Sequence, residues 1–463
     1  MTRPGREDED KERTMKVSEV GLTRNLARFI AETWPEDIPA EMYEHAKVAW
    51  LDWFAVLMAG KEEPLVEKLV HFARLMGGFP QATILGRGMK VSACQAALIN
   101  GSASHALDYD DSMADFLGHP SVILFPALTA LAEWKEKSGC ELLTAYLIGL
   151  KIGATIGACA GLEHYAAGWH GTSTIGRLAA AAGCARLLVL DEPHALWALG
   201  IAGTQASGLK RVFGTMTKPY HAGKAAQVGL ESALLAENGF TSAEDILEGQ
   251  HGFFDLLKGA VNQEALASLG KTWEADKLVQ KYHASCHATH SPIEAALDVV
   301  AREGLDLNEI ESLTVHASRM AIDIAGNPDP KTGLEGKFSY AYCVANALLR
   351  GNTGIQAFTD EMVRDPEVQS IMKKIAVVPD PQISALEARV EVKTRDGRVF
   401  EGQSDVLNEI PEISKKRSKV ESKFMDLCAP VLGERKAVTL MSTFRSLDEV
   451  PNVRSVIRQV NLV

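Results

Sequence analysis

The sequence TSTIGRLAAAAGCARLLVL, residues 172–190, indicates the kind of fold that this chain builds. Small residues fill its middle, and it shows no alternation of apolar and polar positions. Because small side chains let neighbouring helices approach closely, the stretch predicts a helix inside a closely packed helical core. The apolar run at 178–190 is also too short and too interrupted to predict a membrane span.

Helical patterns extend outward from this stretch through most of the first 270 residues. They are clearest at 39–58, 122–137, 141–159 and 222–238, with glycine and proline at the joints between them. We therefore expect residues 19–270 to form a large all-helical domain.

The pattern changes beyond about residue 271. Residues 386–394 alternate apolar and polar side chains, and RDGR at 395–398 indicates a hairpin turn before a return strand at 399–402. We expect residues 271–410 to form a smaller α+β domain. Residues 411–463 are again helical in pattern, and we expect them to rejoin the helical domain. The predicted fold class is mainly α.

Composition restricts the classes of function. The net charge of -12 argues against nucleic acid or an anionic membrane as a partner. The seven cysteines are scattered without a CxxC pair, which favours a reducing compartment. Residues 1–18 are charged and contain no apolar signal core, so we expect a disordered tail and a cytoplasmic protein.

The sequence lacks the motifs that bind common cofactors or build a serine hydrolase. It contains no GxxxxGK[ST] loop, no GxGxxG that opens a helix after a strand, and no GxSxG elbow. We therefore expect no nucleotide or dinucleotide cofactor.

The run NGSASHALDYDDSMADFLGHPS, residues 100–121, concentrates groups that can exchange protons. It contains no lysine or arginine, and its titratable residues are His105, Asp108, Asp110, Asp111, Asp115 and His119. One interpretation is a solvated acidic loop that follows a helix. The other is the wall of an active site, where a histidine and a carboxylate are held together for proton transfer.

Two further segments place polar groups at the start of a predicted helix. His170 lies in GWHGTST, whose helix-start amides and hydroxyls would suit a carboxylate ligand. Lys218 and His221 lie in KPYHAGKAA, where cations oppose the helix macrodipole and indicate anion binding. The alternatives are a helix cap with an exposed histidine and a solvated basic loop.

The segment KYHASCHATH, residues 281–290, is the densest histidine cluster. If it is helical, His283, His287 and His290 share one face, with Cys286 beside them. That face could bind zinc, bind a carboxylate and transfer a proton, or simply pack. In KFSYAYCVANAL, residues 337–348, at most one of two tyrosines can face a site, and a buried tyrosine with a satisfied hydroxyl is the default.

Together these segments resemble the MmgE/PrpD family over nearly the whole chain after the tail. The matching pieces are INGSASHALDYDD with GHPS, the region from GWHGTST, the region from KPYHAGKAA, KYHASCHATHSPIEAAL and KFSYAYCVANAL. The resemblance implies a large helical domain formed by both chain ends and a smaller α+β lid domain. It also implies a homodimer, a small polycarboxylate substrate, and neither a metal nor an organic cofactor.

Carried over residue by residue, the resemblance implies two groups of site residues. The expected catalytic residues are His119, His170, Asp108 and Tyr342, and the expected substrate-binding residues are Ser112, Lys218, Lys281, Cys286 and His287. The family's decarboxylase has threonine at the position of Ser112. It has histidine at the position of Cys286, with His287 following one residue later here.

The expected activity is that of a lyase that dehydrates a 2-methylcitrate-like hydroxy-polycarboxylate by histidine-based proton transfer next to a carboxylate. Decarboxylation of the cis-aconitate type and epimerisation of the iminodisuccinate type remain alternatives. An alternative of another class is a non-catalytic, metal-binding helical module that uses His283, His287 and His290. Elemental analysis of the purified protein distinguishes that module from the enzyme.

Overall fold

The structure is a computed structural model, and it describes residues 21–351, 353–384, 386–406 and 412–461. The chain divides into two compact units. We call them the helical unit (residues up to 106, 110–280 and 413 onward) and the mixed unit (107–109 and 281–412). The predicted tail at 1–18 lies outside the described residues. The predicted boundary after residue 270 differs from this division, because Val279 pairs with Ser112 by backbone hydrogen bonds inside the helical unit.

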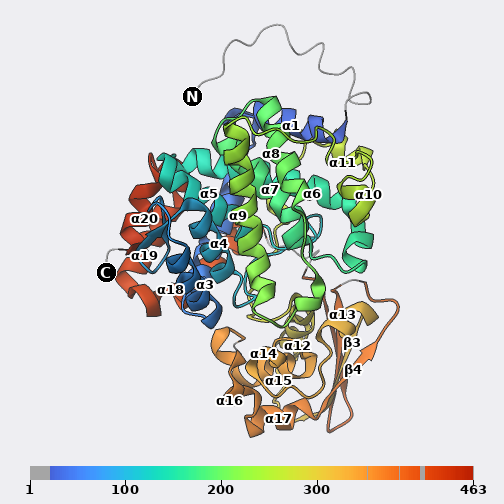
Figure 1. The fold of residues 1–463 in the computed structure, drawn as a ribbon. Helices are drawn as coiled ribbons and strands as arrows, with labels where there is room; N and C mark the ends of the chain where they lie inside the picture. Colours follow the sequence, from blue (N-terminus) through green and yellow to red (C-terminus); the bar gives the residue numbers. More distant parts are fainter. Residues whose placement is uncertain (1–20, 352, 385, 407–411, 462–463) are drawn as a thin grey trace. The chain divides into compact units, whose positions relative to one another are not determined.

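The helical unit is built from long helices around a buried, alanine-rich centre (Figure 1). Every residue of α7 is buried, as expected for the small residues of the quoted stretch. The helices of this unit are α1 (Leu22–Glu32), α2 (Ala40–Gly60), α3 (Pro64–Met76), α4 (Ala93–Ser104), α5 (Ser121–Lys135), α6 (Gly139–Ala166), α7 (Gly171–Leu187), α8 (Glu192–Thr204), α9 (Thr217–Glu237), α10 (Phe253–Leu257), α11 (Gln263–Ala267), α18 (Ile413–Leu432), α19 (Glu434–Arg445) and α20 (Val453–Asn461).

Two glycines allow α4 and α9 to pack at close range. A Cβ added to Gly223 would lie 2.0 Å from the carbonyl oxygen of Leu98, and one added to Gly101 would lie 2.7 Å from the Cα of Gly223. No larger residue fits either position without moving backbone. This close packing brings the first turns of α9 to the C-terminal end of α4, where the candidate site lies.

The prediction that this half of the chain is all-helical is wrong in one place. Strands β1 (Ala82–Ile84) and β2 (Met89–Val91) form an antiparallel hairpin within the helical unit. Its turn contains Gly86 and Gly88, both at positive φ, which glycine adopts without strain.

Within the described residues, one helix is long and apolar enough to cross a membrane by length and composition. It is α6, and 94% of its most apolar window is buried inside the protein. Burial of this extent is typical of a core helix.

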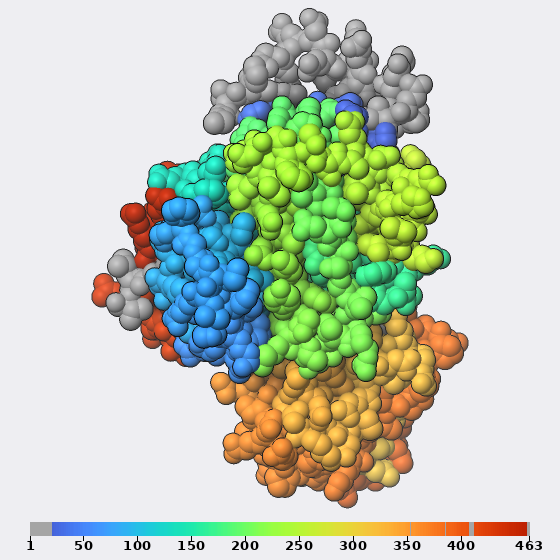
Figure 2. All heavy atoms as spheres, viewed as in Figure 1, coloured from blue at the N-terminus to red at the C-terminus, as the bar shows by residue number. Residues whose placement is uncertain are grey.

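Helix α3 lies at the surface of the same unit, in the blue region of Figure 2. Its residue His71 is exposed.

The mixed unit combines a four-stranded sheet with short helices. Its sheet order is β4-β3-β5-β6, with β3 parallel to β4 and the other pairs antiparallel. In β5 every second residue is buried, and α12 packs against β5 and β6. The elements are α12 (His290–Glu303), β3 (Ile310–Ala317), α13 (Arg319–Ala325), α14 (Gly333–Gly336), α15 (Tyr340–Arg350), α16 (Asp360–Val363), α17 (Pro366–Met372), β4 (Ile375–Pro379), β5 (Ala388–Thr394) and β6 (Val399–Ser404).

The predicted fold class, mainly α with a smaller α+β part, is confirmed. The hairpin predicted from residues 386–402 is the β5–β6 pair.

Candidate active site

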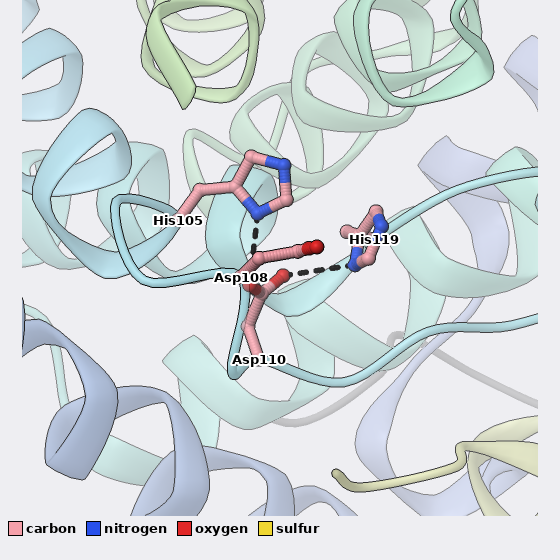
Figure 3. A group of neighbouring side chains, drawn as sticks. All are labelled: His105, Asp108, Asp110 and His119. Carbon is pink, nitrogen blue, oxygen red and sulfur yellow. Dashed lines mark hydrogen bonds and ion pairs between the residues drawn. The ribbon is translucent and has the colours of Figure 1, made fainter. Parts of the chain in front are cut away.

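Asp110 joins two histidines in the loop between α4 and α5 (Figure 3). One carboxylate oxygen lies 2.8 Å from Nδ1 of His105, and the other lies 3.0 Å from Nδ1 of His119. His105 is the residue directly after α4, and His119 lies two residues before α5. The two helix ends therefore fix both rings against one carboxylate.

The surroundings of His119 decide which ring nitrogen carries its proton. Its Nδ1 also lies 2.8 Å from the backbone carbonyl oxygen of Asp111. A carbonyl oxygen and a carboxylate can only accept, so Nδ1 must donate. This leaves Nε2 of His119 as the nitrogen that can exchange a proton with a ligand.

Asp110 stays ionised between its two donors. Burial alone would raise its pKa, but the electrostatic and hydrogen-bonding interactions with the two imidazole rings, His105 and His119, together outweigh burial and hold that pKa well below its usual value. Burial lowers the pKa of His105 to about 4, followed in size by the opposing effect of Asp110. His105 is thus a neutral ring that donates its Nδ1 proton to Asp110.

A second pair of histidines forms where α7 and α9 begin. His170 is the N-cap residue of α7, and its Nδ1 lies 3.0 Å from Nδ1 of His221 in the first turns of α9. Burial and then the charge of Lys218 hold the pKa of His170 well below its usual value. Burial, followed by Arg177 and Lys218, lowers the pKa of His221 to about 4.

The two pairs lie next to each other within the helical unit. The ring centroids of His105 and His119 are 4.6 Å apart, and those of His105 and His170 are 6.5 Å apart. One pair contains a carboxylate and the other is surrounded by cationic side chains. Two neighbouring histidines are therefore held in opposite electrostatic surroundings, which suits one proton donor and one proton acceptor.

The cations that the acidic run lacks come from distant parts of the sequence. Lys423 of α18 is buried and pairs with Asp52 of α2 at 2.7 Å, and its charge also acts on Asp110 and Asp111. Lys416, about two helical turns earlier in α18, donates to the carbonyl oxygen of Leu278 at 2.8 Å. Helix α18 thus places two buried lysines near the acidic loop.

Asp111 behaves differently from its neighbour. Its carboxylate accepts from the backbone N–H and hydroxyl of Ser121, and that hydroxyl lies 2.8 Å from the Tyr146 hydroxyl. Burial and the nearby Asp52 raise its pKa to about 8, against the smaller opposing effect of Ser121. Asp111 is therefore a protonated, structural group at neutral pH.

Lys281, which we expected to bind a substrate carboxylate, contacts Asp108 within the mixed unit. Its Nζ donates to the backbone carbonyl of Asp108 at 2.8 Å and to the side-chain Oδ1 at 3.0 Å. Lys337 donates to the carbonyl oxygen of Leu107. Two buried lysines therefore hold the segment 107–109, in which Asp108 adopts a positive φ of 54°.

The histidine cluster at 281–290 does not form one helix, so the condition for a shared helical face is not met. Residues 281–286 are irregular, residues 287–289 form a 3-10 turn, and α12 begins at His290. The ring centroids of His283 and His287 still lie 4.9 Å and 4.7 Å from that of His290. In the described part of the chain, this cluster does not present a set of donor atoms close enough together to hold a metal ion.

Three other predicted site residues have structural contacts. The buried hydroxyl of Tyr342 donates to the carbonyl of Ala357, so its proton is already engaged. Ser112 pairs through its backbone with Val279. Cys286 is half-buried, and its backbone N–H donates to the carbonyl of Lys337. Their expected roles toward a substrate remain predictions.

The group around Asp110 also contains enough donor atoms for a metal. Donor atoms of His105, Asp110 and His119 lie within 4.8 Å of one another. However, both Nδ1 atoms are already engaged as donors: that of His105 donates to Asp110 at 2.8 Å, and that of His119 donates to the Asp111 carbonyl at 2.8 Å while lying 3.0 Å from the Asp110 carboxylate. A metal ion would need these nitrogens deprotonated and the atoms farther apart.

Comparison with known proteins identifies the family. Residues 24–265 match the MmgE/PrpD N-terminal domain, and residues 283–449 match the MmgE/PrpD C-terminal domain. The chain belongs to the MmgE/PrpD family. The resemblance inferred from the sequence motifs is therefore confirmed.

Curated MmgE/PrpD relatives include two kinds of enzyme. The cis-aconitate decarboxylase-like protein oryM of Aspergillus oryzae is 28% identical over 418 residues, covering 84% of this chain and 86% of that protein. The cis-aconitate decarboxylase of Aspergillus terreus is 26% identical over 472 residues, covering 95% and 96%. The 2-methylcitrate dehydratase of Cupriavidus necator is 24% identical over 412 residues, covering 80% and 81%. These relatives support an enzyme.

Sequence reasoning missed three members of the site in this MmgE/PrpD protein. His105, Asp110 and His221 were noticed in their segments but not chosen as site residues. The sequence cannot tell which of four neighbouring carboxylates faces a histidine. The contact between His170 and His221 depends on how α7 and α9 pack, which no local pattern encodes.

Proposed function

We propose that this protein is a lyase that dehydrates a 2-methylcitrate-like hydroxy-polycarboxylate, without a metal or organic cofactor. The observation that carries the proposal is the pair of neighbouring histidines in opposite surroundings, His119 beside Asp110 and His170 beside His221 and Lys218. Dehydration needs a base to remove a proton next to a carboxylate and an acid to protonate the leaving hydroxyl. Dehydration uses both groups in each turnover, whereas decarboxylation needs only a proton donor.

The remaining residues have roles in binding. Lys218 lies over the Phe213 ring at 5.6 Å, close enough to His170 to affect its pKa, and would bind a substrate carboxylate there by a charge-assisted hydrogen bond. We assign a similar role to Lys281. Asp108 remains a secondary candidate for protonating the hydroxyl, whereas the Tyr342 hydroxyl already donates to the Ala357 carbonyl.

Decarboxylation of a cis-aconitate-like substrate is the second candidate. It is favoured by the decarboxylase relatives, which are more identical to this chain and cover more of it than the dehydratase does. The cysteine at position 286, where the decarboxylase type has histidine, disfavours it. Decarboxylation also requires only a proton delivered to carbon, so it leaves one of the two histidines without a role.

Proton NMR in heavy water tests the proposal. The purified protein is mixed in turn with 2-methylcitrate, citrate, cis-aconitate and iminodisuccinate, with EDTA present. The expected result is conversion of a hydroxy acid to its unsaturated product, seen as a new vinyl proton from citrate or as an uncoupled allylic methyl signal from 2-methylcitrate, and it means dehydration. Formation of itaconate from cis-aconitate would mean decarboxylation, and deuterium uptake without net change would mean epimerisation. No change in any substrate would contradict the proposed substrate class.

A further inference from the structure

His221 contacts one of the two ring nitrogens of His170, Nδ1. The two Nδ1 atoms are 3.0 Å apart, the ring centroids are 5.3 Å apart, and both side chains are buried. The Nδ1 atom of His170 makes this hydrogen bond. Among the described residues, no hydrogen bond to its Nε2 atom is found. The arrangement leaves Nε2 for a substrate.

The position of the His170 ring is fixed from several sides. Its backbone N–H donates to the carbonyl of Gly208 at 3.0 Å, and its own carbonyl accepts from the N–H groups of Ser173 and Thr174. The edge of its ring meets Phe213 with 4.9 Å between centroids. With the ring held in place, the identity of the protonated nitrogen is the remaining variable.

One of the two Nδ1 atoms must donate and the other must accept. Both rings are neutral near pH 7, because burial and nearby cations lower both pKa values. The charged and titratable groups that act on the pair are His105, His119, Lys218 and Arg177. A neutral imidazole carries one N–H, so the direction of this single hydrogen bond sets the tautomer of both rings.

We propose that His221 is a positioning residue that accepts the Nδ1 proton of His170 and thereby makes His170 the proton acceptor of the reaction. This inference rests on the proposed function. The C–H bond next to the substrate carboxylate breaks, its proton forms a bond with Nε2 of His170, and its electron pair forms the carbon–carbon double bond. The C–O bond breaks, and the hydroxyl leaves as water with a proton from Nε2 of His119, whose Nδ1 lies 3.0 Å from Asp110.

The tautomer can be measured without any substrate. Nitrogen-15 NMR of histidine-labelled protein at pH 7, with signals assigned by loss in His170→Gln and His221→Gln, should show His170 protonated at Nδ1 and His221 protonated at Nε2. The opposite pair of tautomers would overturn the proposal. This result does not depend on turnover, so failure of the proposed function and failure of this inference are distinguishable.

Kinetics of His221 variants provide the second readout. His221→Leu removes the acceptor and should lower kcat about 10- to 100-fold, with KM changed less than about twofold. His221→Asn, which offers an acceptor oxygen near the same place, should recover part of this loss. His221→Asp should move the acidic limb of the kcat–pH profile to higher pH, because a carboxylate favours the imidazolium form of His170.

The exposed His71→Leu is the matched control and should retain wild-type kinetics. Wild-type kcat in His221→Leu, or a pH profile of His221→Asp that does not move, would contradict the role of His221.

Discussion

At the residue scale, the chemistry depends on which atoms of His119 are already used. Its Nδ1 donates to the Asp111 carbonyl and lies 3.0 Å from the Asp110 carboxylate, so only Nε2 can act on a ligand. His119→Ala should therefore cut turnover by roughly 10²- to 10⁴-fold, the range for one acid–base group. Steady-state kinetics measure this loss of turnover, and the variant His71→Ala, at an exposed histidine, is the control. Near-wild-type turnover of His119→Ala would remove His119 from the mechanism.

Asp111 makes a prediction about stability and pH. Its pKa is about 8 in the folded protein and about 3.9 in an unfolded chain, so the folded state binds more protons between these values. The stabilisation that Asp111 provides is therefore lost as the pH rises from about 4 to about 8, and the free energy of unfolding does not change further through this group above about pH 8.

Asp111→Asn cannot ionise, and its amide oxygen can still accept from the backbone N–H of Ser121. The variant's Tm should equal that of wild type near pH 4 and exceed it increasingly up to pH 8. Thermal unfolding at pH 4, 6 and 8.5 measures this difference. Asp115→Asn, at an exposed carboxylate, should show no such trend. A constant Tm difference across this range would show that Asp111 is ionised in the folded protein.

Part of the site could be predicted from residues alone. The acidic run, the histidine between glycines and the basic helix start each contain residues that the structure brings together, namely His119, His170 and Lys218. The proton partners of the two histidines could not be predicted, because the same run offers several equivalent carboxylates. Only the end of α4 places Asp110, rather than another acid, between His105 and His119.

At the scale of elements, α18 is what allows the acidic loop to be buried. Lys423 and Asp52 form a buried pair between α18 and α2. Lys423→Met should destabilise the protein by about 3–5 kcal/mol, because it leaves the Asp52 carboxylate buried without this partner. Chemical denaturation followed by circular dichroism measures the loss.

The double variant Asp52→Leu/Lys423→Met is the matched test of this pair. It should recover most of the loss, because two apolar side chains replace two charges. Equal stability of Lys423→Met and wild type would mean that the pair does not stabilise the fold.

Helices and strands with strong periodicity were predictable as elements. The alternation at 386–394 and the turn at 395–398 produced the β5–β6 hairpin, because side chains there must alternate between core and solvent. Whether residues 281–290 are helical was left open by the sequence, and the structure shows that they are not one helix. Contacts of these histidines with each other, and of His283 with Thr353 and Glu294, replace helical hydrogen bonds.

At the scale of the whole molecule, the family could be inferred from motifs spread along the chain, and it was confirmed. The assembly is a proposal: we propose a homodimer in solution. Mass photometry at low micromolar and nanomolar concentration should find twice the chain mass. A monomer at both concentrations would contradict this proposal.

The central claim is that His119 and His170 move a proton at a carbon next to a carboxylate. The most direct test is deuterium uptake from heavy water into 2-methylcitrate, cis-aconitate and their products, followed by proton NMR for wild type, His119→Ala, His170→Ala and the double variant. We predict incorporation at that carbon with the wild type, at least about 100-fold slower incorporation in each single variant, and none in the double variant. Wild-type rates of incorporation in the double variant would contradict the account.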